Sequence, residues 1–227
     1  MKKLFMVLTM AVIIGTLILV GCAPAPAPTP KPAPTPAPAP APEKVIELKF
    51  GHQNPPTGAT TVKYLDPWAK KVEEACKGKV KITTYPAESL FKAREVIEAT
   101  VGGIADIAWV QVGYFASSFP LTSVMSLPFL CLDSGTLNGK ERSGGAVNSH
   151  ILQELYETFP EVQAEWKNVK CLFVHCTDPY KLFTVKKPAQ TMDDLRGLKL
   201  RELAGPPTEM WKLLGASPMM LPAPDIY

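Results

Sequence analysis

The sequence lacks the motifs of common catalytic and nucleotide-binding sites. It contains no Gly-x-Ser-x-Gly, no His-Glu-x-x-His, no phosphate-binding loop and no dinucleotide glycine pattern. Only three histidines occur in 227 residues, and they are too scattered along the chain to suggest one site. His52 and His175 fall at expected strand ends, where a lone histidine is more often structural than a ligand contact. These absences argue against an enzyme and indicate no cofactor.

A strong excess of basic residues is also missing. The whole chain has 24 basic and 21 acidic residues, a formal charge of +3. Lys2 and Lys3 are the only charges in residues 1–21, so the remaining chain has 22 basic and 21 acidic residues, or +1. Because no stripe of basic residues with interleaved aromatics remains, nucleic acid is not an expected partner.

What the sequence does contain at its start is an export signal. Lys2 and Lys3 precede an uncharged apolar run over residues 4–20, and Gly21-Cys22 closes it. The pattern predicts a lipoprotein signal peptide over residues 1–21, with Cys22 as the lipidated first residue of the mature protein. An uncleaved signal anchor is the alternative. Both interpretations place the rest of the chain outside the cytoplasmic membrane, on the periplasmic or cell-surface side.

Residues 22–42 are dominated by proline. From Pro24 to Pro42 every second residue is proline, mostly separated by alanine. Because proline fixes φ and has no amide donor, the segment predicts an extended polyproline II stalk without a binding role of its own. At about 3.1 Å per residue, some twenty residues would reach about 60 Å from the lipid.

The cysteines after Cys22 do not follow a metal-binding spacing, so no metal site is predicted. They are Cys76, Cys131, Cys171 and Cys176. An exported protein can form disulfides, and four cysteines allow three pairings. Cys171 and Cys176 would lie about 16 Å apart along one strand, too far to join each other. Buried free thiols are an equally open alternative.

From residue 43 onward, strand-like and helix-like patterns alternate. Strands are expected at residues 45–50, 80–85, 104–110, 169–174 with an extension at 182–185, and 198–201. Helices are expected at residues 65–76, 90–101, 151–159 and 208–214. Thr191 and Asp194 predict a capping box. This order predicts an α/β fold with a parallel sheet.

Several segments, in this order, resemble the substrate-binding proteins of TRAP transporters (tripartite ATP-independent periplasmic transporters), in their dicarboxylate-receptor-like family. The most specific is Gly197-Leu198-Lys199-Leu200-Arg201. The others are residues 48–51, 78–80, 85–86, 103–108, 119–121, 127–129 and 214–218. The resemblance covers essentially all of residues 45–227.

The resemblance implies a two-lobed, periplasmic-binding-protein-like α/β fold of type II. Residues 43–177 would form the first lobe, and residues 178–227 would begin the second. Members of the family continue past the position of Tyr227, so we expect a fold that is incomplete at the C-terminus, either as a fragment or as a natural truncation.

The resemblance also implies a ligand-binding arginine at the end of the strand that contains Gly-Leu-Lys-Leu-Arg. Arg201 occupies that position. A guanidinium is always charged, and its planar fork pairs two N–H donors with two carboxylate oxygens. The alternative for Arg201 is an ordinary ion pair with Glu202 or Glu209.

Further contacts are implied by the resemblance. Gln53 follows the first strand, and Gln111 and Tyr114 follow the strand that contains Asp106, at places where family members contact their ligands. Trp109 would line the cleft or belong to the core, and Tyr180 would pack on an apolar ligand or on the hinge. Relatives that bind sialic acid are more charged near these positions, which favours a smaller or more apolar organic acid here.

The expected function is therefore a lipid-anchored solute receptor. It would capture an organic acid between two lobes and deliver it to the membrane permease subunits of a TRAP transporter, without chemistry on the ligand. Two alternatives are the receptor of an ATP-driven importer and a sensory protein that docks on a signalling receptor.

Overall fold

The computed structural model of the protein describes residues 44–185, 188–221 and 225–226. The predicted signal peptide, Cys22 and the stalk lie outside the described residues. Residues 43–227 form one compact unit, and the expected division between lobes after residue 177 remains a prediction. No helix in the described ranges is long and apolar enough to cross a membrane.

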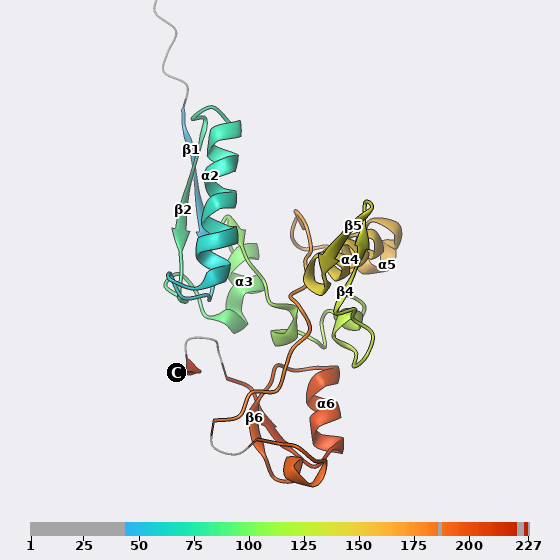
Figure 1. Ribbon diagram of the computed structural model, residues 1–227. Helices are drawn as coiled ribbons and strands as arrows, with labels where there is room; N and C mark the ends of the chain where they lie inside the picture. Colours follow the sequence, from blue (N-terminus) through green and yellow to red (C-terminus); the bar gives the residue numbers. More distant parts are fainter. Residues whose placement is uncertain (1–43, 186–187, 222–224, 227) are drawn as a thin grey trace, which may run out of the picture. The chain divides into compact units, whose positions relative to one another are not determined.

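A parallel three-stranded sheet organises the first part of this unit. Its strands β1 (Ile46–Gly51), β2 (Val80–Tyr85) and β3 (Ile107–Ala108) lie in the order β2-β1-β3, as Figure 1 shows for β1 and β2. The expected strands at 45–50 and 80–85 and the parallel pairing are confirmed. The third strand is shorter than the expected 104–110, because the amides of Ile104 and Ala105 both bond to the carbonyl of Ala99.

Two helices cover this sheet with apolar side chains. A π-helical turn, η1 (Thr61–Leu65), leads into α2 (Asp66–Ala75), which lies along β1 and β2 (Figure 1). Phe50, Leu65, Ala69 and Ile82 form the buried core there. The expected helix at 90–101 starts later, as η2 (Ala93–Glu95) and α3 (Val96–Val101), because carboxylates of Glu95 and Glu88 accept the amides of Lys92 and Ala93.

The middle of the chain contains a hairpin that the pattern did not predict. Two short helices, η3 (Val112–Tyr114) and η4 (Thr122–Ser126), precede the antiparallel strands β4 (Ser134–Leu137) and β5 (Lys140–Ser143). The helix α4 (Gly144–Thr158) begins seven residues before the expected start at residue 151, and α5 (Pro160–Ala164) follows it. Gly144 is packed so closely that an added Cβ would lie 2.1 Å from the carbonyl oxygen of Leu132.

The expected strand at 169–174, with its extension at 182–185, was wrong. Neither segment pairs with another strand in the described part of the chain. Side chains of α4 take some of the amides that a neighbouring strand would otherwise bind. Gln153 Oε1 accepts the amide of Val174 at 3.0 Å, and Ser149 Oγ accepts that of Cys176 at 2.9 Å.

The last part is a second β-α-β unit. The strands β6 (Lys199–Arg201) and β7 (Ser217–Met219) are parallel and joined by α6 (Pro206–Leu213). The expected strand and helix are confirmed, within one or two residues. The capping box is confirmed as well, because Thr191 and Asp194 bond reciprocally at the start of η5 (Asp193–Leu195).

Candidate functional site

Arg201 is the last residue of β6, and its guanidinium has no acidic partner among the described residues. Nε donates to the carbonyl of Leu221 at 3.1 Å, and Nη2 donates to the hydroxyl of Tyr114 at 3.4 Å. The alternative, an ion pair of Arg201 with Glu202 or Glu209, does not form in the structure. Glu202 accepts from the amide of Leu203 and from Trp211 Nε1, and Glu209 bonds Lys212. Arg201 therefore keeps N–H donors and a full charge for another partner.

Tyr114 is fixed beside Arg201 by close packing between η3 and the segment after β6. Tyr114 is buried together with Ala93 and Leu203. Gly113 lies so near Leu203 that an added Cβ would be 2.8 Å from its Cδ1, and the carbonyl of Gly113 accepts the amide of Ala204 at 3.0 Å. These contacts join two segments that are about ninety residues apart in sequence, and they hold the phenol against the guanidinium.

Gln53, Gln111 and Tyr180 form a continuous hydrogen-bonded relay. Gln53 Nε2 donates to Gln111 Oε1 at 3.3 Å, and Gln111 Nε2 donates to the Tyr180 hydroxyl at 3.1 Å. Desolvation around the Tyr180 hydroxyl group raises its pKa, and the positive charge of Arg201 opposes that rise. The phenol end of the relay is therefore within electrostatic reach of Arg201.

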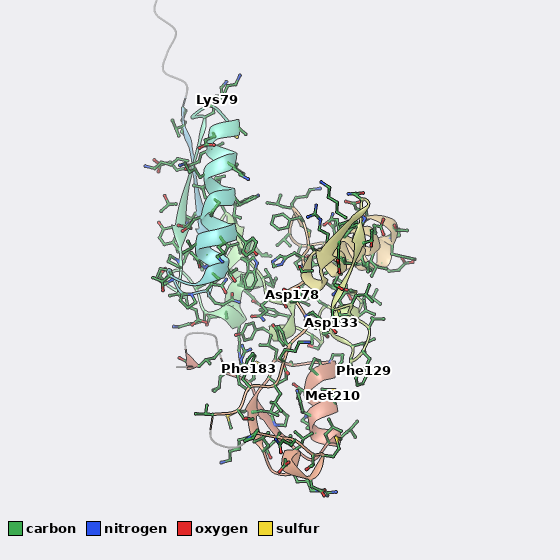
Figure 2. The ribbon with its side chains drawn as sticks, viewed as in Figure 1. Lys79, Phe129, Asp133, Asp178, Phe183 and Met210 are labelled. Atoms are coloured by element: carbon green, nitrogen blue, oxygen red, sulfur yellow. The ribbon has the colours of Figure 1, made fainter. Side chains whose placement is uncertain are left out.

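The segment that contains Tyr180 is attached to the hairpin and to α4. Asp178 Oδ1 accepts the amide of Gly145 at 2.6 Å, and Lys181 Nζ bonds Asp133 Oδ1 at 3.1 Å. Figure 2 labels Asp133 and Asp178 where this segment passes the start of α4. Residues on either side of Tyr180 are thus tied down, although 59% of the tyrosine's own surface is exposed.

Trp109 forms a pair with His175. Its Nε1 donates to His175 Nε2 at 2.8 Å, and the two ring centroids are 5.8 Å apart. Burial lowers the pKa of His175, which favours the neutral ring that can accept this bond. A series of ring contacts continues from His175 through Phe173 and Trp68 to Phe50. Trp109 is therefore connected to the sheet core rather than standing alone.

His52 packs against the core strand rather than bonding to the relay. Its ring is 5.8 Å from that of Phe50 in an edge-on arrangement, and it is fully buried. Burial lowers the pKa of His52, while the nearby charge of Asp66 and the backbone of Asn54 oppose that effect. His52 belongs to the core region beneath α2.

The structure brings the six predicted residues into three bonded groups: the relay of Gln53, Gln111 and Tyr180, the pair of Arg201 and Tyr114, and the pair of Trp109 and His175. Sequence reasoning gave little weight to His175 and did not select Phe173. No local signal marks either residue, because their partners are far away in the sequence. In the described ranges, no cluster of three or more His, Cys, Asp or Glu side chains is arranged to hold a metal ion. The groups supply one cation, amides and phenols, which suits binding of a polar ligand.

Comparison with known families decides the classification. Residues 50–227 match the family described as "Bacterial extracellular solute-binding protein, family 7" (DctP). The chain belongs to this family. The 2,3-diketo-L-gulonate-binding periplasmic protein YiaO of Escherichia coli is 26% identical over 185 residues, which are 79% of this chain and 52% of the relative. The family is extracytoplasmic, and its members bind and transport substrates rather than convert them.

Solved structures of TRAP solute-binding proteins share the fold. One of them, from an unidentified marine microbe, is specific for aromatic acids and was determined with 3-hydroxybenzoate. It is 30% identical to this chain, the TM-score is 0.71, and the match covers 81% of this chain and 53% of the neighbour's chain. Another, from Rhodoferax ferrireducens, holds copurified benzoate. It is 27% identical to this chain, the TM-score is 0.70, and the match covers 80% of this chain and 53% of the neighbour's chain. The expected two-lobed α/β class is confirmed. The chain spans about half the length of the curated relatives that it matches.

Proposed function

We propose that the protein is the receptor of a TRAP transporter and binds an organic acid through Arg201. The observation that carries this proposal is the guanidinium at the end of β6, which contacts a phenol and a carbonyl but no carboxylate of the described residues. A ligand carboxylate supplies the missing negative charge and accepts the unused donors. Ligands of open α/β sheets also bind beyond the carboxyl ends of the strands, which is where Arg201 lies.

The side chains near Arg201 favour an aromatic acid over a sugar acid. Tyr114 bonds Arg201 and Tyr180 ends the relay, so two phenol rings belong to the candidate site, and Trp109 and His175 form a further pair of rings. A sugar acid needs many hydrogen-bonding partners, whereas rings pack well against a flat apolar ligand. The similarity to TRAP proteins that hold benzoate and 3-hydroxybenzoate supports the same ligand class for this chain.

We also propose that the mature protein is anchored by lipid on Cys22 and hands its ligand to membrane permease subunits. The uncharged run that ends in Gly21-Cys22 supports the anchor, and the proline-rich residues 24–42 supply the reach. Metabolic labelling with an alkyne fatty acid tests the anchor. Labelled wild-type protein and unlabelled Cys22→Ala are expected, and equal labelling of both would contradict it.

Isothermal titration of the purified protein with benzoate tests the role of Arg201. Arg201→Met removes the charge and the donors, and we expect affinity to fall about tenfold to a hundredfold, as for loss of a charge-assisted hydrogen bond. Arg196→Met is the matched control, because Arg196 is exposed and bonds only to Asp193 among the described residues. Equal affinities of Arg201→Met and the control would refute Arg201 as the anchor.

A further inference from the structure

The amide oxygen of Gln53 is buried and has no hydrogen-bond partner. Gln53 is 1% exposed, and its Nε2 is occupied by Gln111, but no donor in the described part of the chain reaches its Oε1. Most buried polar side-chain atoms in proteins have a partner, because desolvation without one destabilises the fold. A buried acceptor without a donor, at the end of a relay that leads toward Arg201, therefore points to a group that is supplied from outside the chain.

The relay explains why Gln53 cannot satisfy itself by rotating its amide. Gln111 uses its oxygen for Gln53 and its nitrogen for Tyr180. If the amide of Gln53 were turned over, its oxygen would face the oxygen of Gln111. The contact is restored only if Gln111 is turned over as well, so that its oxygen accepts a hydrogen bond from the Tyr180 hydroxyl. In that reversed relay, Gln53 would be left with an unused N–H donor instead of an unused acceptor. In either state one polar atom of Gln53 stays unpaired.

We infer that the ligand carries a hydroxyl group that bonds to Gln53, so that the protein selects hydroxy-substituted aromatic acids over their unsubstituted parents. A hydroxyl fits both states of the relay, because it can donate to an amide oxygen and accept from an amide nitrogen. Gln53 is the end of the relay away from Tyr180, and Arg201 belongs to the separate pair with Tyr114, so the carboxylate and the hydroxyl would be held at separate points. This inference rests on the proposed function, since it concerns a second contact to the same ligand.

Selection by Gln53 follows from the cost of leaving it unpaired. A site built to bond a hydroxyl rejects the analogue without one, because its own buried group then keeps no partner. A merely apolar site would distinguish benzoate from a hydroxybenzoate only weakly. The affinity for a hydroxybenzoate should therefore exceed the affinity for benzoate, and this ratio should depend on Gln53.

The test is titration of the purified protein with benzoate and with 2-, 3- and 4-hydroxybenzoate. For the wild type we expect one hydroxybenzoate to bind at least about tenfold more tightly than benzoate. Gln53→Leu removes both polar atoms, and we expect the ratio of hydroxybenzoate affinity to benzoate affinity to fall to about one. Gln163→Leu is the control, because within the described part of the chain the Gln163 side chain bonds only to backbone carbonyls near the end of α4.

The outcomes separate this inference from the function on which it rests. If none of the four acids binds, the proposed function fails and the inference fails with it. If the acids bind but no hydroxybenzoate exceeds benzoate, or if the ratio survives Gln53→Leu, the receptor function stands and the hydroxyl contact is overturned. If Gln53→Leu does not fold, Gln53→Met replaces it, with the same expected ratio.

Discussion

The protein contains two parallel β-α-β units, and they are held together in different ways. The unit of β1, α2 and β2 has six-residue strands and a shared apolar core that includes Phe50 and Ile82. The unit of β6, α6 and β7 has three-residue strands, and none of the residues of α6 is buried. Apart from the packing of Leu203 on Tyr114, its connections include polar bonds, such as the bond from Trp211 to Glu202 and the bond from Ala204 to Gly113.

The two units also contribute different parts of the candidate site. Gln53 lies two residues after the end of β1 in the unit with the apolar core, whereas Arg201 is the last residue of β6 in the unit with little core of its own. A ligand that bonds to both would therefore connect a well-packed unit to a sparsely packed one.

The largest expected effect is on the apolar core of the first unit. Phe50 is 3% exposed and contacts both Trp68 and His52 through its ring. Phe50→Ala should lower the free energy of unfolding by about 3–5 kcal/mol in urea denaturation, because it leaves a cavity. Leu213→Ala in α6, where the side chain is exposed, should change it by no more than about 0.5 kcal/mol. Similar losses for the two variants would remove the contrast between the units.

A smaller effect is expected from the polar connections of the second unit. Glu202 is buried and accepts from the amide of Leu203 and from Trp211 Nε1 at 3.1 Å. Glu202→Leu leaves both donors without this acceptor and should cost about 1.5–3 kcal/mol in thermal or urea unfolding. Glu209→Leu is the control, because that exposed carboxylate bonds only Lys212 among the described residues. If Glu202→Leu left the free energy of unfolding unchanged, packing and not this acceptor would hold the unit together.

Acid should weaken the first unit gradually. Burial lowers the pKa of His52 and of His175, and ring contacts connect both histidines to the core around Phe50. The unfolded chain therefore binds more protons than the folded chain once pH falls below about 6.5, so stability is complete above that pH and declines as pH falls through it. Thermal melts from pH 7.5 to 5 measure this decline.

The slope of this pH dependence identifies its source. His175→Asn should reduce the slope, because it removes the ring whose protonation burial opposes. A slope that survives the loss of His175 and, separately, of His52 would assign the acid sensitivity to other groups.

The smallest effect is expected on the surface of α6. Lys212 Nζ bonds Glu209 at 2.9 Å, and both side chains are more than half exposed. Lys212→Met should change the free energy of unfolding by less than about 0.5 kcal/mol, because exposed ion pairs contribute little. A loss of more than about 1 kcal/mol in urea denaturation would mean that surface charge stabilises this unit.

The sequence predicts those elements whose pattern is local. The strands at 45–50 and 80–85 and the helix of Trp68 show clear periodicity, and the structure has all three. The segment at 169–174 has strand-like residues, but strand formation needs a partner, and its amides at Val174 and Cys176 bond side chains of α4 instead. The β4–β5 hairpin was missed because its strands are polar, although Asn138-Gly139, both with positive φ, is a typical hairpin turn.

The candidate site is less visible in the sequence than the fold. The position of Arg201 came from the resemblance to a family, because an arginine at a strand end has no unique meaning by itself. The bonds from Gln111 to Tyr180 and from Trp109 to His175 join residues 69 and 66 positions apart. No periodicity encodes such pairs, since they depend on how whole elements pack.

The most direct test of the account is titration of the wild-type protein with benzoate and with benzamide, which has the same shape without the charge. Capture of a carboxylate by Arg201 predicts that benzoate binds and that benzamide binds at least about tenfold more weakly. Equal affinities for the acid and the amide would contradict the central claim that this chain recognises a negative charge.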